Sequence, residues 1–162
     1  MKHTNLNLLY VLDEDKDWAL KRIIQLEQAI ASLGPEFNEV LNQSSETWHD
    51  NAPFDALRDK QAALASELQQ IKNVLASTAP SIPRQVRSIV GIGARVTVYN
   101  KELDKIELFF IAGDWTARSG KTIDGAKVIS TKAPLAQALL GKKAGEETAF
   151  RYPMLIRSVD YA

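Results

Sequence analysis

The sequence predicts an α+β protein, in which an N-terminal antiparallel coiled-coil hairpin is followed by a small domain of strands and one helix. Two stretches of apolar residues recur at alternating intervals of three and four. A short polar segment with a proline separates them, which is typical of two helices packed as a hairpin. Beyond residue 80 the apolar residues alternate instead, and seven of the eight glycines lie beyond residue 90. This change of pattern indicates a second domain of strands and tight turns.

The first helix is expected to run from Asp15 to about Ser44. Four acidic residues between positions 13 and 17 stand where the helix should begin, and carboxylates are favourable at the positive end of the helix dipole. The Gly34-Pro35 pair lies inside the helix, but the apolar repeat continues in phase across it, so we predict a bend rather than an end. The apolar seam of this helix consists of Ile23, Leu26, Ile30, Leu33, Phe37 and Val40.

The second helix is expected to run from Pro53 to about Ser77, because proline is favoured at the first helical position. Its seam consists of Phe54, Leu57, Gln61, Leu64, Leu68, Ile71 and Leu75. Gln61 is the one polar interruption, which suits a register device or a partly exposed position. The segment between the helices, residues 43–52, then forms the tip of the hairpin, and it carries Glu46 and Asp50.

Two prolines and small polar residues around positions 77–83 stop the second helix and mark a linker. The hairpin is therefore assigned to residues 1–79, the linker to 80–83 and the second domain to 84–162. Five strands are expected in the second domain, at residues 95–99, 105–112, 128–130, 148–151 and 155–159, with residues 152–154 as the last turn. One helix is expected from Pro134 to Leu140, because proline stands at its first position and Gly141 follows its end.

The composition excludes several classes of protein. The net charge of the 162 residues is zero, which argues against general nucleic-acid binding by bulk attraction. Residues 1–80 carry a net charge of −5 and residues 81–162 a net charge of +5, so the two halves suit different surroundings. The absence of cysteine excludes disulfides, thiolate metal sites and cysteine nucleophiles. Neither a membrane-spanning apolar run nor a signal peptide is recognisable, so the cytoplasm is the expected location.

A motif near the C-terminus resembles a known family. The residues from Ile129 to Glu146 are similar to the C-terminal signature of the bacterial GreA/GreB transcription elongation factors, approximately I-S-x-x-S-P-I-A-x-A-L-L-G-K-x-x-G-D. The identical positions are Ile129, Ser130, Pro134, Ala136, Ala138, Leu139, Leu140, Gly141, Lys142 and Gly145. Shorter similarities lie at 93–98, at 111–114, at Pro35-Glu36 and at 50–54. The order of the parts also resembles that family, with a hairpin first and a small FKBP-like domain second.

The resemblance implies a factor that inserts its hairpin through the secondary channel of RNA polymerase. In that family two carboxylates at the tip help the polymerase to hold a second Mg²⁺ and a water, and the polymerase active site then cuts backtracked RNA. The factor is therefore not expected to be an enzyme itself, and it is expected to have no cofactor or metal of its own. Its partner would be bacterial RNA polymerase, with nascent RNA and DNA met only inside the elongation complex. We expect a monomer without membrane contact.

The tip differs from the family pattern D-x-x-E-N-A. Asp50 aligns with the second acid, because Asn51 and Ala52 follow it, but the position of the first acid falls on Thr47. Glu46 lies one residue earlier and would replace it if the loop holds one more residue. Asp50 and Glu46 are therefore the candidate carboxylates, and a non-cleaving regulator or inhibitor of the same channel is the alternative. Asp50 alone also suits a carboxylate that caps the second helix, and Glu46 a solvated loop acid.

Six further residues are candidates for contacts with the partner: Trp48, His49, Asn51, Phe54, Lys142 and Lys143. Four of them have a structural explanation as well. Trp48 suits packing under the loop, Phe54 opens the apolar seam, and the two lysines complement the negative end of a helix dipole. Glu46, His49 and Asp50 together also suggest a preformed metal site, which is a weak signal within one short loop.

Two other classes of function remain at this point. The FKBP-like domain alone suggests a peptidyl-prolyl isomerase or chaperone, although a fold is a weak argument for a function. An independent hydrolase is disfavoured, because the chain has no cysteine and only two histidines, His3 and His49.

Overall fold

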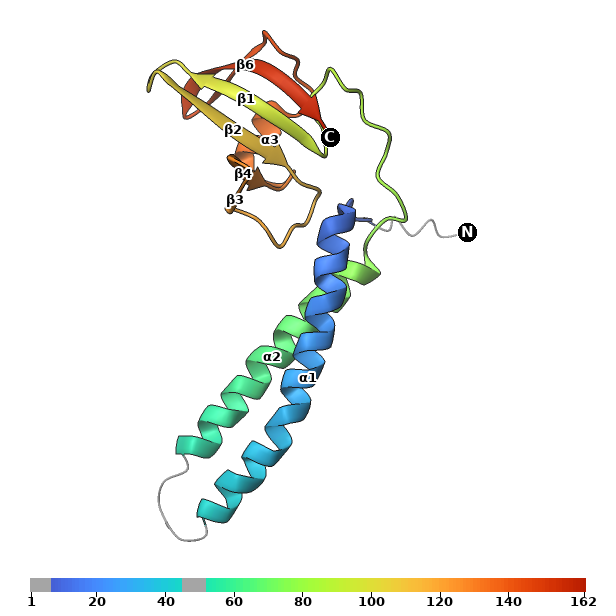
Figure 1. Cartoon of the computed structure of the whole chain (residues 1–162), viewed down its shortest axis with the longest axis vertical. Coiled ribbons are helices and arrows are strands. Elements are labelled where there is room, and N and C mark those ends of the chain that lie inside the picture. The colour runs from blue at the N-terminus through green and yellow to red at the C-terminus, as the bar shows by residue number, and fades with distance from the viewer. Residues whose placement is uncertain (1–6, 45–51) are drawn as a thin grey trace. The chain divides into compact units, whose positions relative to one another are not determined.

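The computed structural model describes residues 7–44 and 52–162 (Figure 1). The chain divides into two compact units. The hairpin unit comprises Asp17–Ala76, and the globular unit comprises the residues up to Lys16 together with Ser77–Ala162. Helix α1 (Asp13–Ser44) therefore contributes its first turn to the globular unit and the rest to the hairpin unit.

The hairpin unit confirms the predicted pair of antiparallel helices, α1 and α2 (Ala52–Ala76) (Figure 1). Residues early in α1 contact residues late in α2, and residues late in α1 contact residues early in α2. Arg22 meets Glu67 at 2.7 Å, whereas Glu36 meets Lys60 at 4.0 Å near the other end. In the ranges that the structure describes, no helix is long and apolar enough to cross a membrane.

The burial of side chains confirms the predicted seams. Leu26, Leu33 and Ile71 are buried, and Gln61 is exposed. The remaining seam residues are half-buried, namely Ile23, Ile30, Phe37, Val40, Phe54, Leu57, Leu64, Leu68 and Leu75. A two-helix unit has no third layer to cover its seam, so half-burial is what the geometry allows. Helix α1 also continues through Gly34 and Pro35, as the unbroken repeat predicts.

The globular unit is built on one six-stranded sheet in the order β3-β4-β2-β1-β6-β5. The strands are β1 (Ala94–Asn100), β2 (Lys105–Ile111), β3 (Thr122–Ile123), β4 (Ala126–Ile129), β5 (Glu147–Phe150) and β6 (Tyr152–Tyr161). Strands β2 and β4 are parallel, and all other neighbours are antiparallel. Helix α3 (Pro134–Leu139) packs Ala136 and Leu139 into a core with alternate residues of β1, such as Val96 and Val98.

Two details of the sheet differ from the prediction of five strands. The two-residue strand β3 was not predicted, and it pairs with β4 across a turn in which Asp124 (φ 50°) and Gly125 (φ 79°) are both left-handed. An Asp-Gly pair is typical of such hairpin turns. The predicted turn at residues 152–154 is wrong, because the chain reverses at Arg151 (φ 62°) and these three residues belong to β6.

The first described residues belong to the globular unit because backbone hydrogen bonds hold them there. The Leu9 N–H donates to the Ser77 carbonyl at 2.7 Å, and the Ala79 N–H donates to the Leu9 carbonyl at 2.8 Å. Tyr10 lies against Gly113, where a Cβ would stand only 2.1 Å from the Tyr10 carbonyl oxygen. The sequence pattern assigns all of residues 1–79 to the hairpin, because the segment before α1 is too short to show a periodicity of its own.

Candidate functional site

The distal end of the hairpin is the first candidate site, because it carries the segment with the predicted carboxylates. Glu46, Trp48, His49, Asp50 and Asn51 lie outside the described residues. The structure places what flanks them, namely the last turns of α1 and the first turns of α2. The geometry of these turns determines where the segment starts and ends.

Aromatic packing joins the two helices close to this end. The rings of Phe37 and Phe54 meet edge to face, with centroids 5.6 Å apart and planes at 73°. The Arg58 guanidinium lies over the Phe54 ring, at 5.9 Å from the ring centroid. Such aromatic pairs contribute about 0.5–1.5 kcal/mol beyond the area they bury. Phe54 is therefore a structural contact between the helices, whatever further contact it makes with a partner.

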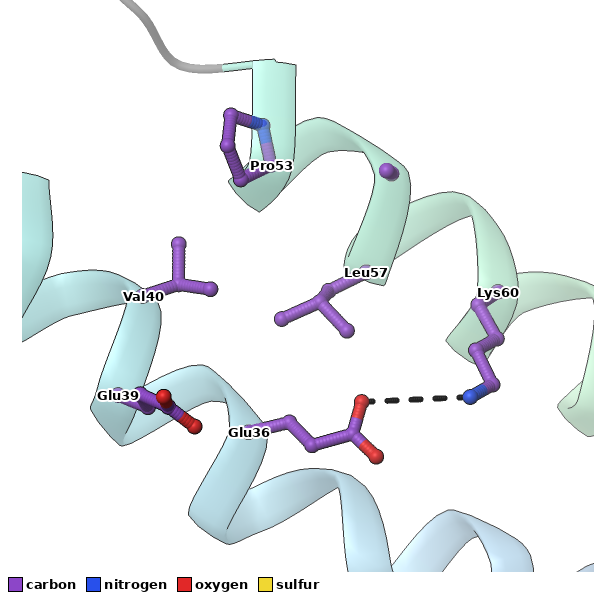
Figure 2. A pocket seen from close by; sticks show the side chains of 7 residues that line it. Glu36, Glu39, Val40, Pro53, Leu57 and Lys60 are labelled. Carbon is purple, nitrogen blue, oxygen red and sulfur yellow. Dashed lines mark ion pairs between the residues drawn. The ribbon is translucent and has the colours of Figure 1, made fainter.

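A hollow of about 490 Å³ lies between the helices next to this aromatic pair (Figure 2). Figure 2 shows Val40, Leu57 and Pro53 pointing toward one another across it. Its rim is charged, since Glu36 pairs with Lys60 at 4.0 Å, and Glu39 has no basic partner within the described ranges. The distal end thus combines an apolar floor with unneutralised negative charge.

Ion pairs between the first half of α1 and the second half of α2 hold the two helices in one register. Arg22 donates two hydrogen bonds to the Glu67 carboxylate, at 2.7 and 3.0 Å. The hydrogen bonds from Arg22 lower the pKa of Glu67, and those same bonds raise the pKa of Arg22. Lys72 and Glu27 form a second pair at 3.2 Å. A bidentate pair specifies geometry as well as charge, so it restricts sliding of one helix along the other.

Metal binding is the chemistry that carboxylates at this end of the hairpin could serve. Within residues 7–44 and 52–162, no group of three acidic or histidine side chains is placed to hold a metal ion. Mg²⁺ prefers oxygen ligands and keeps several waters, so one or two carboxylates added from outside can complete an existing Mg²⁺ site. Two carboxylates on the segment between α1 and α2 would serve that purpose.

The two candidate lysines lie in the globular unit, just after α3. Gly141 adopts a left-handed conformation (φ 82°) past the helix end, as the sequence predicts. Lys142 is half-buried, and its carbonyl accepts a hydrogen bond from the Val90 N–H at 2.9 Å. Lys143 is exposed. Neither side chain has an ion-pair partner among the residues that the structure describes.

One charged cluster was not predicted from the sequence. Asp15 is fully buried and accepts hydrogen bonds from Arg118 Nε at 3.1 Å, Arg118 Nη2 at 3.0 Å and Thr116 Oγ1 at 2.9 Å. The sequence suggests only a helix-start acid for Asp15, because residues a hundred positions apart come together only through the fold. An acid at a helix start beside several other acids gives no signal that distinguishes the buried one.

Comparison with known proteins identifies the family. The family model for the C-terminal part of the transcription elongation factors GreA and GreB matches residues 85–159. The transcription elongation factor GreA of Metamycoplasma arthritidis is 36% identical over 123 residues, which cover 73% of this chain and 71% of that protein. GreA of Mycoplasmopsis pulmonis is 29% identical and covers 82% of this chain and 76% of that protein.

Other relatives are covered less completely. GreA of Ruegeria pomeroyi is 26% identical, and the match spans 64% of each chain. A solved structure, GreA factor homolog 1 of Thermus thermophilus, aligns with 94% of this chain and 98% of its own, at 11% identity and a TM-score of 0.43. By its match to the Metamycoplasma protein and to the C-terminal model, the chain belongs to the GreA/GreB transcription elongation factor family.

Proposed function

We propose that this protein binds bacterial RNA polymerase, inserts its helical hairpin through the secondary channel and stimulates cleavage of backtracked RNA by the polymerase active site. Membership of the GreA/GreB family is the observation that carries this proposal. The paired helices support it, because they present a short segment with two carboxylates at one end of a coiled coil. The factor itself is no enzyme.

Asp50 and Glu46 are the residues proposed to act at the polymerase centre. Their carboxylates would supply oxygen ligands to a second Mg²⁺ that the polymerase holds, and a water on that metal would attack the RNA phosphodiester. Two metal ions about 4 Å apart stabilise the attacking and the leaving oxygen together. The chain contributes reach and charge, and the polymerase contributes the other ligands and the Mg²⁺.

The remaining candidates are proposed to contact the partner. Trp48, His49 and Asn51 lie in the segment between the helices, and Phe54 follows it at the start of α2. Lys142 and Lys143 lie in the globular unit and present positive charge. RNA and DNA are met only inside the elongation complex, which agrees with a net charge of zero.

The test is addition of the protein to a backtracked elongation complex with Mg²⁺. Wild type should shorten the RNA, Asp50→Ala should abolish the shortening, and Glu46→Ala should reduce it. Asp55→Ala is the matched control, because Asp55 is an exposed acid in the first turn of α2 and should be dispensable. The proposal fails if saturating wild type leaves the RNA at full length.

A second candidate function rests on the spacing of the acids. Glu46 and Asp50 are separated by three residues, where the family pattern D-x-x-E has two. If Glu46 does not reach the metal, the same hairpin occupies the channel without promoting cleavage and inhibits the polymerase. Reduced RNA synthesis without RNA shortening, equal for wild type and Asp50→Ala, would support this function over the first.

A further inference from the structure

A cavity of about 250 Å³ lies in the globular unit, beside the start of α3 and on the sheet face that α3 covers. Its apolar lining comes from β2, α3 and the last two strands, and consists mainly of Phe109, Leu135, Phe150, Tyr152 and Met154. Pockets for drug-sized ligands measure about 300–1,000 Å³, so this cavity suits a smaller molecule.

Three polar side chains reach the cavity from three neighbouring strands: Asn100 on β1, Glu107 on β2 and Lys127 on β4. Glu107 is opposite Val98, which lies two residues before Asn100 on β1. Lys127 is opposite Phe109, which lies two residues after Glu107 on β2. Paired residues, and residues two apart on one strand, share a face of the sheet. The three polar side chains therefore lie on one face, next to the apolar lining.

Asn100 holds a hydrogen-bond donor that the protein does not use. The residue is only 2% exposed, and its Oδ1 accepts the Glu102 and Leu103 N–H groups, both at 3.1 Å. These two bonds establish which end of the amide is the oxygen. In the part of the chain that the structure describes, the Nδ2 group donates to no acceptor, and no fully buried side-chain polar atom lacks a partner. The Nδ2 group is therefore reached from the cavity, where it indicates an acceptor oxygen on a ligand.

The two charged side chains at the cavity are also unpaired. Glu107 is half-buried and Lys127 is exposed, and neither forms an ion pair with any residue in the described ranges. Arg151 lies at the apolar side of the cavity, with its guanidinium 5.5 Å from the centroid of the Phe150 ring. One base, one acid and one amide donor beside an apolar cavity form a set that suits a zwitterion. A base and an amide bind a carboxylate, and an acid binds an ammonium group.

We propose that this cavity binds a free amino acid with an apolar side chain, such as leucine. Lys127 and the Asn100 Nδ2 group bind the α-carboxylate, and Glu107 binds the α-ammonium group. The apolar side chain lies against Leu135 and Met154, which removes it from water. A nucleotide fits less well, because the cavity is small and Glu107 would repel its phosphates. This site is independent of the function proposed above.

The experiment is a titration of the full chain with leucine, followed by nitrogen–proton correlation NMR. The side-chain NH₂ signals of Asn100 report directly on the cavity and should shift to saturation. Three analogues each lack one part of the ligand: leucinamide lacks the carboxylate, N-acetyl-leucine lacks the ammonium group, and glycine lacks the apolar side chain. Each analogue should bind about tenfold more weakly than leucine.

Two variants test the assignment of the charged groups. Lys127→Gln should weaken binding of leucine about tenfold and leave binding of leucinamide unchanged, because leucinamide has no carboxylate. Glu107→Gln should weaken binding of leucine about tenfold and leave binding of N-acetyl-leucine unchanged. Lys121→Gln and Glu102→Gln are the matched controls, since both side chains are exposed and neither lines the cavity. The controls should change each affinity by about twofold at most. Thermal melting checks that all four variants stay folded.

Four outcomes would overturn the proposal. The first is no saturable shift at about 10 mM leucine, which would fill most of a site with a Kd of about 1 mM. Equal affinities for leucine, leucinamide and N-acetyl-leucine would show an apolar cavity that ignores the charged groups. Tighter binding of N-acetyl-leucinamide, which resembles a residue inside a chain, would assign the cavity to a peptide segment instead. Equal losses in the site variants and the controls would show a general effect of charge. None of these outcomes affects the proposed function, which the backtracked-complex assay tests separately.

Discussion

Asp15 shows how much one buried charge depends on its partners. Its carboxylate is fully buried, and the Arg118 side chain that it binds is 23% exposed. We expect Asp15→Ala to lower the free energy of unfolding of the globular unit by about 2–3 kcal/mol, because it leaves Arg118 without its counter-charge in a mostly buried position. Asp15→Asn keeps an acceptor for Thr116 and should cost less. Urea denaturation measures both, and equal midpoints for wild type and Asp15→Ala would contradict the expectation.

Gly113 is a residue whose missing side chain matters. A Cβ at this position would stand 2.1 Å from the carbonyl oxygen of Tyr10, and neither backbone can move without losing the hydrogen bond from the Asp114 N–H to that oxygen. We expect Gly113→Ala to destabilise the globular unit by about 2 kcal/mol or more. Gly34→Ala is the control, since a Cβ there meets no atom within 4 Å. A melting temperature of Gly113→Ala equal to that of wild type would argue against close packing at Gly113.

At the scale of elements, periodicity was sufficient for the long helices and insufficient for short or irregular strands. The seams of α1 and α2 could be read from the sequence because seven-residue spacing persists over several turns. Strand β3 has only two residues, which is too few for any alternation to show, although the Asp124-Gly125 pair was a usable turn signal. The turn at Arg151 could not be predicted, because arginine rarely adopts a left-handed conformation.

Pro35 destabilises the helix in which it lies. It lies inside α1, where a proline lacks the N–H for the helical hydrogen bond and its ring crowds the preceding turn. Its side chain is exposed, so it contributes no packing that would offset this cost. We expect Pro35→Ala to stabilise the hairpin unit by about 2–3 kcal/mol. Loss of helical circular dichroism at a lower temperature than in wild type would refute this.

The Arg22–Glu67 pair should make the hairpin sensitive to acid. The hydrogen bonds from Arg22 lower the folded-state pKa of Glu67 below its unfolded value. The pair's contribution is therefore fully present above the unfolded pKa of about 4.3. It is lost as the pH falls through the lower folded value. Both side chains are partly exposed, so the effect is small and screened by salt. Melting of the hairpin at pH 7 and near pH 3 should show a larger drop for wild type than for Glu67→Gln, and identical drops would refute the assignment.

For the whole molecule, the sequence predicted the two units and the family. Only the fold showed that the globular unit also includes the residues up to Lys16. The C-terminal signature could be recognised because glycine, proline and apolar residues at fixed intervals surround α3. The sequence identifies the two candidate carboxylates of the site, Glu46 and Asp50. Their spacing in the sequence does not determine their positions in space.

Because the first described residues belong to the globular unit, removing them should affect that unit and spare the hairpin. Val11 is buried, and Leu9 and Tyr10 together make four hydrogen bonds, to Ser77, Ala79 and both the carboxylate and backbone N–H of Asp114. We expect a variant that lacks residues 1–11 to lose about 2 kcal/mol in the globular unit, after the entropy of ordering the segment is subtracted. Hydrogen exchange should be faster at the Ala79 and Asp114 amides and unchanged in α2 around Leu64. Faster exchange in α2 alone would instead place these residues with the hairpin.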